Sequence, residues 1–327
     1  SVGRRKAMFT GYAVFFVGTI MSLYATDLNQ MLVSRLLQGF GMAAPKVLST
    51  AIVRDLFLGR AMARVMSFVM VIFILVPMLA PLFGQVMLSF FDWRAIFIAI
   101  GVFALISMCW YWLRQAETLN ADHQSSFTWH RTKNTIKTIV TTPQVIGNTL
   151  SASILSGPFI FYLGSSQQLF QQTYQLGEWF PYYFALIALA IGMASFVNGK
   201  KVMKHGMLKI LTFALRSIVF TSSIFMVIVW LKGGLPDLLL TTIYMFITFF
   251  SLGLTFGNMN ALAMEPLGKM AGIGAAFVGA MSTFIASLLS VVIGWFYNDT
   301  MYPLVISFAC AGLLAMLVVW RVNRGSD

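Results

Sequence analysis

The chain has 327 residues, of which 59% are hydrophobic and only 10% are charged. Soluble globular proteins carry roughly a quarter charged residues, so this composition excludes an ordinary soluble enzyme and predicts a protein that lies largely in lipid. The net charge of +12 is of the kind that nucleic-acid-binding proteins carry, but the positions of the basic residues account for it differently, as described below.

Ten apolar runs follow one another along the chain, and each approaches or exceeds the roughly 20 residues that a helix needs to cross a bilayer. They lie near 7–25, 29–53, 63–90, 95–113, 145–170, 181–199, 208–231, 238–263, 271–297 and 303–320. Only residues 114–143 form a long polar break. We therefore expect an all-α polytopic membrane protein with four spans in residues 1–113, a cytoplasmic linker over 114–143, and a six-helix bundle in residues 144–327.

The linker contains one apolar helical stripe flanked by basic side chains: Phe127, Trp129, Ile136 and Val140, beside Arg131, Lys133 and Lys137. This pattern is typical of a short helix that lies on the membrane surface. A plain flexible linker is the alternative.

The basic residues gather on one side of the predicted membrane. If the ten spans alternate in direction, 17 of the 22 Lys and Arg residues fall on the side that holds both chain ends, and 2 fall on the other. The basic side is cytoplasmic by the positive-inside rule, which places the C-terminus in the cytoplasm. The net charge is thus a topology signal, and no nucleic-acid partner is expected.

The sequence shows no catalytic or metal-binding constellation. Its two cysteines, Cys109 and Cys310, lie within hydrophobic runs, and its three histidines lack metal-ligand spacing. All ten acidic residues fall at span ends or in loops, without a paired carboxylate at membrane depth. We therefore expect no enzyme, no cofactor and no metal.

Two cations, Arg35 and Lys46, lie within one hydrophobic span, where a cation at the bilayer centre costs about 2.5–3.5 kcal/mol. They are three turns apart and share a helical face with Gln38 and Met42. Such a polar stripe predicts a water-filled cavity or solute pathway. For Arg35, snorkelling toward the outer end of the span is the alternative.

Two later spans carry polar and aromatic faces that suit a ligand with both apolar and polar parts. Their residues are Asn148, Ser151, Phe159 and Tyr162 in one span, and Thr248, Ser251, Thr255 and Asn258 in the other. The alternative for each polar residue is helix packing, because Ser, Thr and Asn also join helices to one another.

The third apolar run contains Pro77, Pro81 and Gly84. Proline removes a backbone donor and bends a helix, so this run predicts a hinge or a seal, with a static kink as the alternative. An internal repeat is also visible, since Gly84 and Gly294 precede similar acidic turns. Parallel halves of this kind are a transporter architecture; chance matching of short motifs is the alternative.

Several segments resemble known motifs. Gly3-Arg4-Arg5-Lys6 resembles the second half of the signature between the second and third spans of the major facilitator superfamily. Residues 35–44, RLLQGFGMAA, resemble the fourth-span motif of its drug/proton antiporters. Residues 54–57, and 80–84 followed by 92–97, are especially like the Bcr/CflA (bicyclomycin and chloramphenicol resistance) branch.

This resemblance implies twelve spans, of which the chain holds the third to the twelfth. It implies a monomer in the bacterial inner membrane that exports small amphipathic drugs by alternating access, in exchange for protons. A carrier for a specific anionic metabolite and a truncated, non-transporting remnant are the alternatives.

The resemblance also assigns roles to single residues. Arg4 is expected to pair with Asp55, beside Arg54, and so to hold the inward gate closed. Arg35 is expected near the proton- and substrate-responsive site, and the run from Pro77 to Gly84 in the antiporter-type bend. Lys46 departs from the pattern, in which a small or apolar residue is usual at this place.

Overall fold

The computed structural model describes residues 3–56, 59–117 and 129–323. Side chains are described within these ranges except at 50–51, 54–55, 59–64, 66–68, 70–71, 73–75, 77–78, 129–132, 134–135 and 268–273. The described regular elements are all helical, which confirms the predicted all-α class. The chain divides into two compact units: unit 1 is Ser1–Val76 with Ala80–Thr128, and unit 2 is Pro77–Leu79 with Trp129–Asp327.

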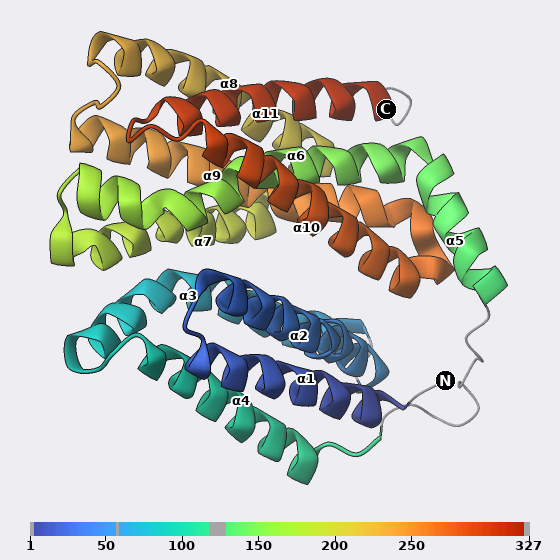
Figure 1. Cartoon of the computed structure of the whole chain (residues 1–327). Helices are drawn as coiled ribbons and strands as arrows, with labels where there is room; N and C mark the ends of the chain where they lie inside the picture. The colour runs from blue at the N-terminus through green and yellow to red at the C-terminus, as the bar shows by residue number, and fades with distance from the viewer. Residues whose placement is uncertain (1–2, 57–58, 118–128, 324–327) are drawn as a thin grey trace. The chain divides into compact units, whose positions relative to one another are not determined.

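Unit 1 is built from four long helices: α1 (Arg4–Tyr24), α2 (Leu28–Leu56), α3 (Gly59–Phe90) and α4 (Arg94–Arg114). Helix α1 packs against α2 on one side and α4 on the other (Figure 1). The crossing of α1 and α2 is close, because a Cβ atom added at Gly11 would lie 2.7 Å from the carbonyl oxygen of Gly41. Small residues at helix crossings permit this approach in a bilayer.

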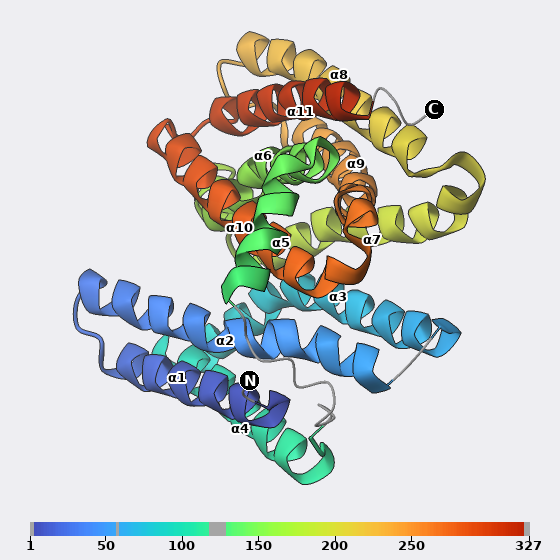
Figure 2. The ribbon, with the colours of Figure 1, turned by 90° about the vertical axis from the view of Figure 1, so that its right-hand side faces the viewer.

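Unit 2 contains the remaining elements. They are α5 (Trp129–Thr141), α6 (Pro143–Ser166), the π-helical turn η2 (Gln167–Thr173), η3 (Gly177–Trp179), α7 (Phe180–His205), α8 (Met207–Leu231), α9 (Leu238–Met264), η4 (Glu265–Met270), α10 (Ala271–Trp295) and α11 (Tyr302–Val322). Helix α6 is central, since it packs against α9, α10 and α11 (Figure 2). It is correspondingly the most buried of the apolar helices.

Eight helices in the described part of the chain are long and apolar enough to span a membrane. The other two predicted spans form α2 and α3, of 29 and 32 residues. At 1.5 Å per residue both exceed the thickness of the hydrocarbon core. Helix α2 carries Arg35, Gln38 and Lys46 among its apolar residues, which lowers its mean hydropathy.

Helix α5 occupies part of the predicted linker. Ile139 is 1% exposed and packs in a small apolar cluster with Val145 and Val278, whereas Lys133 and Lys137 are exposed. The helix is therefore amphipathic, with its apolar side on unit 2. A role at the membrane surface and the boundaries of the linker stay predictions, and Phe127 lies outside the described residues.

We expect Gly41→Ala to destabilise the protein, because its new methyl group would meet the backbone of α1 at Phe15 and Gly11. Overpacking of this kind costs about 1–3 kcal/mol. Gly39, two residues earlier in α2, has open space around its missing side chain, so Gly39→Ala is a matched control with an unchanged or slightly higher midpoint. Thermal unfolding in detergent measures both, and equal midpoints would contradict the close crossing.

Candidate functional site

A line of polar side chains crosses the interface between α1 and α2 in unit 1. Arg35 Nη1 donates to Gln38 Oε1 at 3.0 Å, and Gln38 Nε2 donates to Thr19 Oγ1 at 3.0 Å. Thr19 in turn donates to the carbonyl oxygen of Phe15 at 2.9 Å. Gln38 and Thr19 are buried, so the exposed Arg35 is held at the open end of a buried polar line.

The same guanidinium also contacts an aromatic ring on α4. The Cζ atom of Arg35 lies 5.1 Å from the ring centroid of Phe97, within the range of a cation–π contact. Among the residues that the structure describes, no carboxylate forms an ion pair with Arg35. A guanidinium has five N–H donors, so Arg35 keeps donors for an anionic or carbonyl group.

The other residues of the α2 stripe lie differently from one another. Gln38 is buried against α1, Met42 is half-buried, and Lys46 is exposed. Lys46 is likewise in no ion pair with a described residue. The two cations of the stripe are thus exposed, whereas Gln38, whose amide oxygen holds Arg35, is buried.

A cluster of aromatic rings from α6, α7 and α9 forms the interior of unit 2. The ring centroid of Tyr162 is 4.7 Å from that of Phe249 and 5.6 Å from that of Phe184, on which it stacks. Phe159 is 5.8 Å from Phe249 and 5.7 Å from Phe256. This places Phe159 and Tyr162, both predicted site residues, in one cluster with three rings that sequence reasoning did not select.

The hydroxyl of Tyr162 is the unusual atom of this cluster. The side chain is 1% exposed, and its oxygen has no hydrogen-bond partner among the described residues. Buried polar groups are nearly always paired, so an orphan needs an explanation such as a ligand or a water molecule. Directly after α6, the π-helical turn η2 adds Phe170, whose ring centroid lies 6.3 Å from that of Tyr162; such turns are frequent at functional sites.

The other predicted polar residues of unit 2 make contacts that join helices. Asn148 accepts a hydrogen bond from Asn323, directly after α11, and Ser151 donates to the carbonyl oxygen of Ala315 in α11. Both contacts join the central helix α6 to its neighbour.

On α9, Ser251 donates to Ser217 of α8 at 3.0 Å, and Asn258 donates to Asn198 of α7 at 2.8 Å. Thr255 bonds to its own helix, and the buried Thr248 hydroxyl has no hydrogen-bond partner among the described residues. The predicted stripe of α9 therefore bonds to two different neighbours, α8 and α7.

The predicted gating residues are only partly described. The side chains of Arg54, Asp55 and Pro77 lie outside the described residues, so the Arg4–Asp55 pair stays a prediction. Pro81 is half-buried within α3, and Gly84 has open space around it.

At the start of α1 the structure shows a different acid. Glu117 accepts hydrogen bonds from the backbone N–H groups of Arg4 and Arg5, both at 3.0 Å. Gly3, the N-cap residue, makes no side-chain cap of its own, so Glu117 fills that role from beyond the end of α4. A carboxylate is favoured there by the N–H groups and by the helix dipole.

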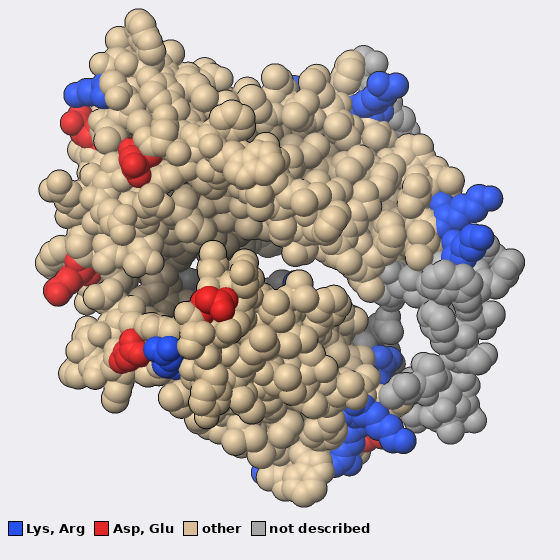
Figure 3. Space-filling view, in the orientation of Figure 1, with Lys and Arg blue, Asp and Glu red and all other residues tan. Residues whose placement is uncertain are grey.

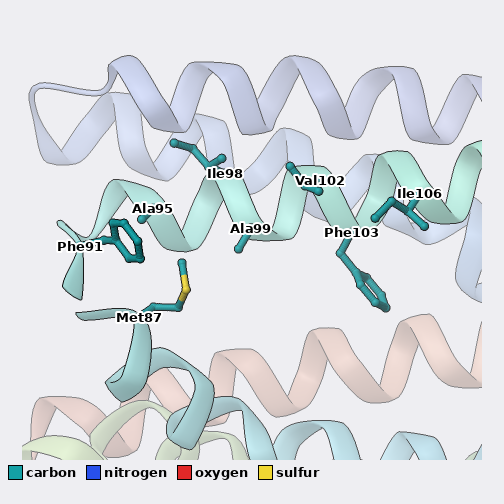
Figure 4. A pocket seen from close by; sticks show the side chains of 8 residues that line it. All are labelled: Met87, Phe91, Ala95, Ile98, Ala99, Val102, Phe103 and Ile106. Carbon is teal, nitrogen blue, oxygen red and sulfur yellow. The ribbon is translucent and has the colours of Figure 1, made fainter. Parts of the chain in front are cut away.

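An open groove of about 480 Å³ lies between the end of α3 and α4 (Figure 4). It is lined only by apolar side chains: Met87, Phe91, Ala95, Ile98, Ala99, Val102, Phe103 and Ile106. The groove lacks the polar groups that orient a solute. Its apolar lining suits contact with an apolar helix face or with lipid chains.

Long apolar helices that enclose a buried polar line in one unit and an aromatic cluster in the other define a polytopic membrane transporter. The family comparison agrees: the model described as Major Facilitator Superfamily matches residues 1–291. The chain belongs to the Major Facilitator Superfamily. The predictions of this family and of a transporter rather than an enzyme are confirmed.

Curated relatives cover most of the chain. It is similar to the uncharacterized MFS-type transporter YdgK of Bacillus subtilis, at 26% identity over 91% of this chain and 74% of that protein. It is also similar to the bicyclomycin resistance protein homolog of Haemophilus influenzae, at 25% identity over 98% and 80%. The multidrug resistance protein MdtL of Escherichia coli is 23% identical over 97% and 79%.

Solved structures share the fold at lower identity. The xylose transporter XylE from E. coli has a TM-score of 0.72 at 12% identity, over 97% of this chain and 80% of that chain. The human organic anion transporter MFSD10 has a TM-score of 0.68 at 16% identity, over 98% and 77%. These likenesses support the fold alone.

We expect Tyr162→Phe to raise the stability of the substrate-free protein by about 1 kcal/mol or more, because leaving a buried hydroxyl unpaired costs about 1–3 kcal/mol. Tyr174→Phe is the matched control. The Tyr174 hydroxyl donates to the carbonyl oxygen of Pro236 at 2.9 Å, and burial raises its pKa, which keeps it protonated. That variant should lose about 1 kcal/mol. Thermal unfolding in detergent distinguishes the two; a loss in both would show that Tyr162 has a partner.

We expect Glu117→Ala to lower stability by about 0.5–2 kcal/mol, the range for loss of a helix N-cap. Glu117→Gln keeps one acceptor oxygen and should lose less. Glu178→Ala, at an exposed acid in η3 of unit 2, serves as the control and should change little. Unfolding midpoints of the three variants measure this, and an unchanged midpoint for Glu117→Ala would refute the capping role.

Proposed function

We propose that the chain is a proton-coupled exporter of small amphipathic drugs that works by alternating access. In this proposal it acts as a monomer in the bacterial inner membrane, with its C-terminus in the cytoplasm. The observation that carries the proposal is the buried polar line that presents Arg35 from within an apolar helix. The names of two relatives, a bicyclomycin resistance protein homolog and a multidrug resistance protein, support drugs as the substrate class.

The chemistry of the two units supports an amphipathic substrate. In unit 2 the rings of Phe159, Tyr162 and Phe249 form a buried aromatic cluster, and the buried hydroxyls of Tyr162 and Thr248 have no hydrogen-bond partner among the described residues. A site of mainly aromatic lining with few polar groups binds compounds that are mostly apolar. In unit 1, Arg35 offers one exposed positive charge, which suits a polar or anionic group.

Proton coupling is proposed from the resemblance of residues 35–44 to drug/proton antiporters. A guanidinium beside a carboxylate favours its charged form. A carboxylate that meets Arg35 would therefore release its proton, and protonation would free it again. The fixed position of Arg35, between the Gln38 amide and the Phe97 ring, suits such an exchange because the guanidinium need not reorient.

The second candidate function is a carrier for an anionic metabolite. Arg35 and Lys46 are exposed on α2 and are in no ion pair with a described carboxylate. Two unneutralised cations on one helix suit a ligand with a negative charge. Lys46→Ala separates the candidates, since it should abolish transport of an acid in the carrier and spare neutral drugs in the exporter.

We expect Arg35→Ala to reduce substrate-driven proton movement at least tenfold in everted membrane vesicles, measured with a fluorescent pH-gradient probe. Arg35→Lys keeps the charge but loses the planar donor set, and should keep part of the activity. Lys232→Ala is the control, because that ammonium pairs with Asp237 at 3.0 Å in an exposed loop. Full activity in Arg35→Ala at equal expression would rule out the proposed role.

A further inference from the structure

One face of α7 is exposed along its whole length. Its large side chains recur at intervals of three or four residues: Tyr182, Leu186, Leu189, Met193 and Phe196 are all exposed. This spacing describes a single helical stripe. Within unit 2 no described helix covers this stripe, and exposed apolar side chains on a membrane helix suit contact with lipid.

The stripe changes from apolar to basic at Lys200. That residue continues the same face after Phe196, and its Nζ atom lies 4.2 Å from the Phe196 ring centroid. Tyr182, at the other end, begins the stripe 18 residues earlier, which is about 27 Å at 1.5 Å per residue. The hydrocarbon core is about 30 Å thick. With Tyr182 at one boundary of this core, Lys200 lies close to the other boundary, where the lipid headgroups begin.

More lysines surround this point. Lys201 and Lys204 follow in the last turns of α7, Gly206 with a φ of +79° makes a one-residue turn, and Lys209 lies in the first turn of α8. All four lysines are exposed. Met203, between them, is 91% exposed.

The described residues provide no carboxylate partner for these lysines. Cations at the opposite helix ends are paired, since Lys232 bonds to Asp237 and Arg94 bonds to Asp92. Figure 3 shows this contrast for unit 2, with acidic side chains at one end of its helices and most of the visible basic ones at the other. The α7–α8 end thus presents an unneutralised positive charge beside lipid-exposed apolar side chains.

We propose that Lys200, Lys201, Lys204 and Lys209 bind the phosphate group of an anionic phospholipid in the cytoplasmic leaflet. Clusters of four or more basic residues next to a membrane span attract anionic headgroups, with about 1 kcal/mol for each residue. The apolar surface of Phe196, one turn before Lys200, contacts the acyl chains of the same lipid. This inference goes beyond transport and does not depend on the substrate.

The test is lipid retention by the whole chain in detergent, read by native mass spectrometry with phosphatidylglycerol and phosphatidylcholine in competition. We expect preferential retention of phosphatidylglycerol, and a loss of roughly thirtyfold in relative affinity in Lys200→Gln with Lys204→Gln. The double Lys→Arg variant at these positions should retain the preference. Lys232→Gln, at the opposite end, is the matched control and should not change it.

Equal retention of the two lipids, or an unchanged preference in the double Gln variant, would overturn the proposal. Inorganic phosphate and glycerol 3-phosphate are added in a separate arm; displacement of the lipid by either at millimolar concentration would show that the ligand is a soluble anion. Since no arm measures transport, the result is independent of the proposed drug export. Folding of each variant is checked by its unfolding midpoint.

Discussion

The hydrocarbon of a bilayer offers no hydrogen-bond partner, so each polar side chain within it must find one inside the protein. In unit 1 this constraint produces the Thr19–Gln38 bond and the 2.8 Å bond from Ser22 to Ser34, both between α1 and α2. In unit 2 it produces the bonds from α9 to α7 and α8. These contacts fix which faces of the helices meet. The positions of Arg35 and of the aromatic cluster follow from them.

Much of the fold could be predicted from hydropathy alone. Apolar runs and their polar breaks locate membrane helices because length and transfer energy decide insertion. The pairing of helix faces could not be predicted, because a bond such as that from Gln38 to Thr19 joins residues 19 positions apart on separate helices. Glu117 lies 113 residues from Arg4. The sequence shows that Glu117 follows the fourth apolar run, but it does not show that the start of α1 is its partner.

Helical periodicity also limited the prediction of the site. It places residues on a common face, yet the residues of the α9 stripe have different partners. Ser251 bonds to α8, and Asn258 bonds to α7. Phe249 and Phe184 were missed because 30 phenylalanines occur in the chain and no local pattern distinguishes these two. Phe97 was missed for a related reason. A cation–π partner depends on how α4 meets α2, which sequence spacing does not specify.

Two polar groups of the candidate site lack a full set of partners among the described residues. The Tyr162 hydroxyl is buried without a partner, and the Arg35 guanidinium is oriented by an amide and a ring but neutralised by no described carboxylate. The buried hydroxyl is less stabilised than it would be in water, and the exposed guanidinium keeps N–H donors for a further partner. A ligand that supplies the absent contact recovers that free energy, about 1–3 kcal/mol for a hydroxyl. Such a modest gain favours binding and still permits release, which a transporter requires at every cycle.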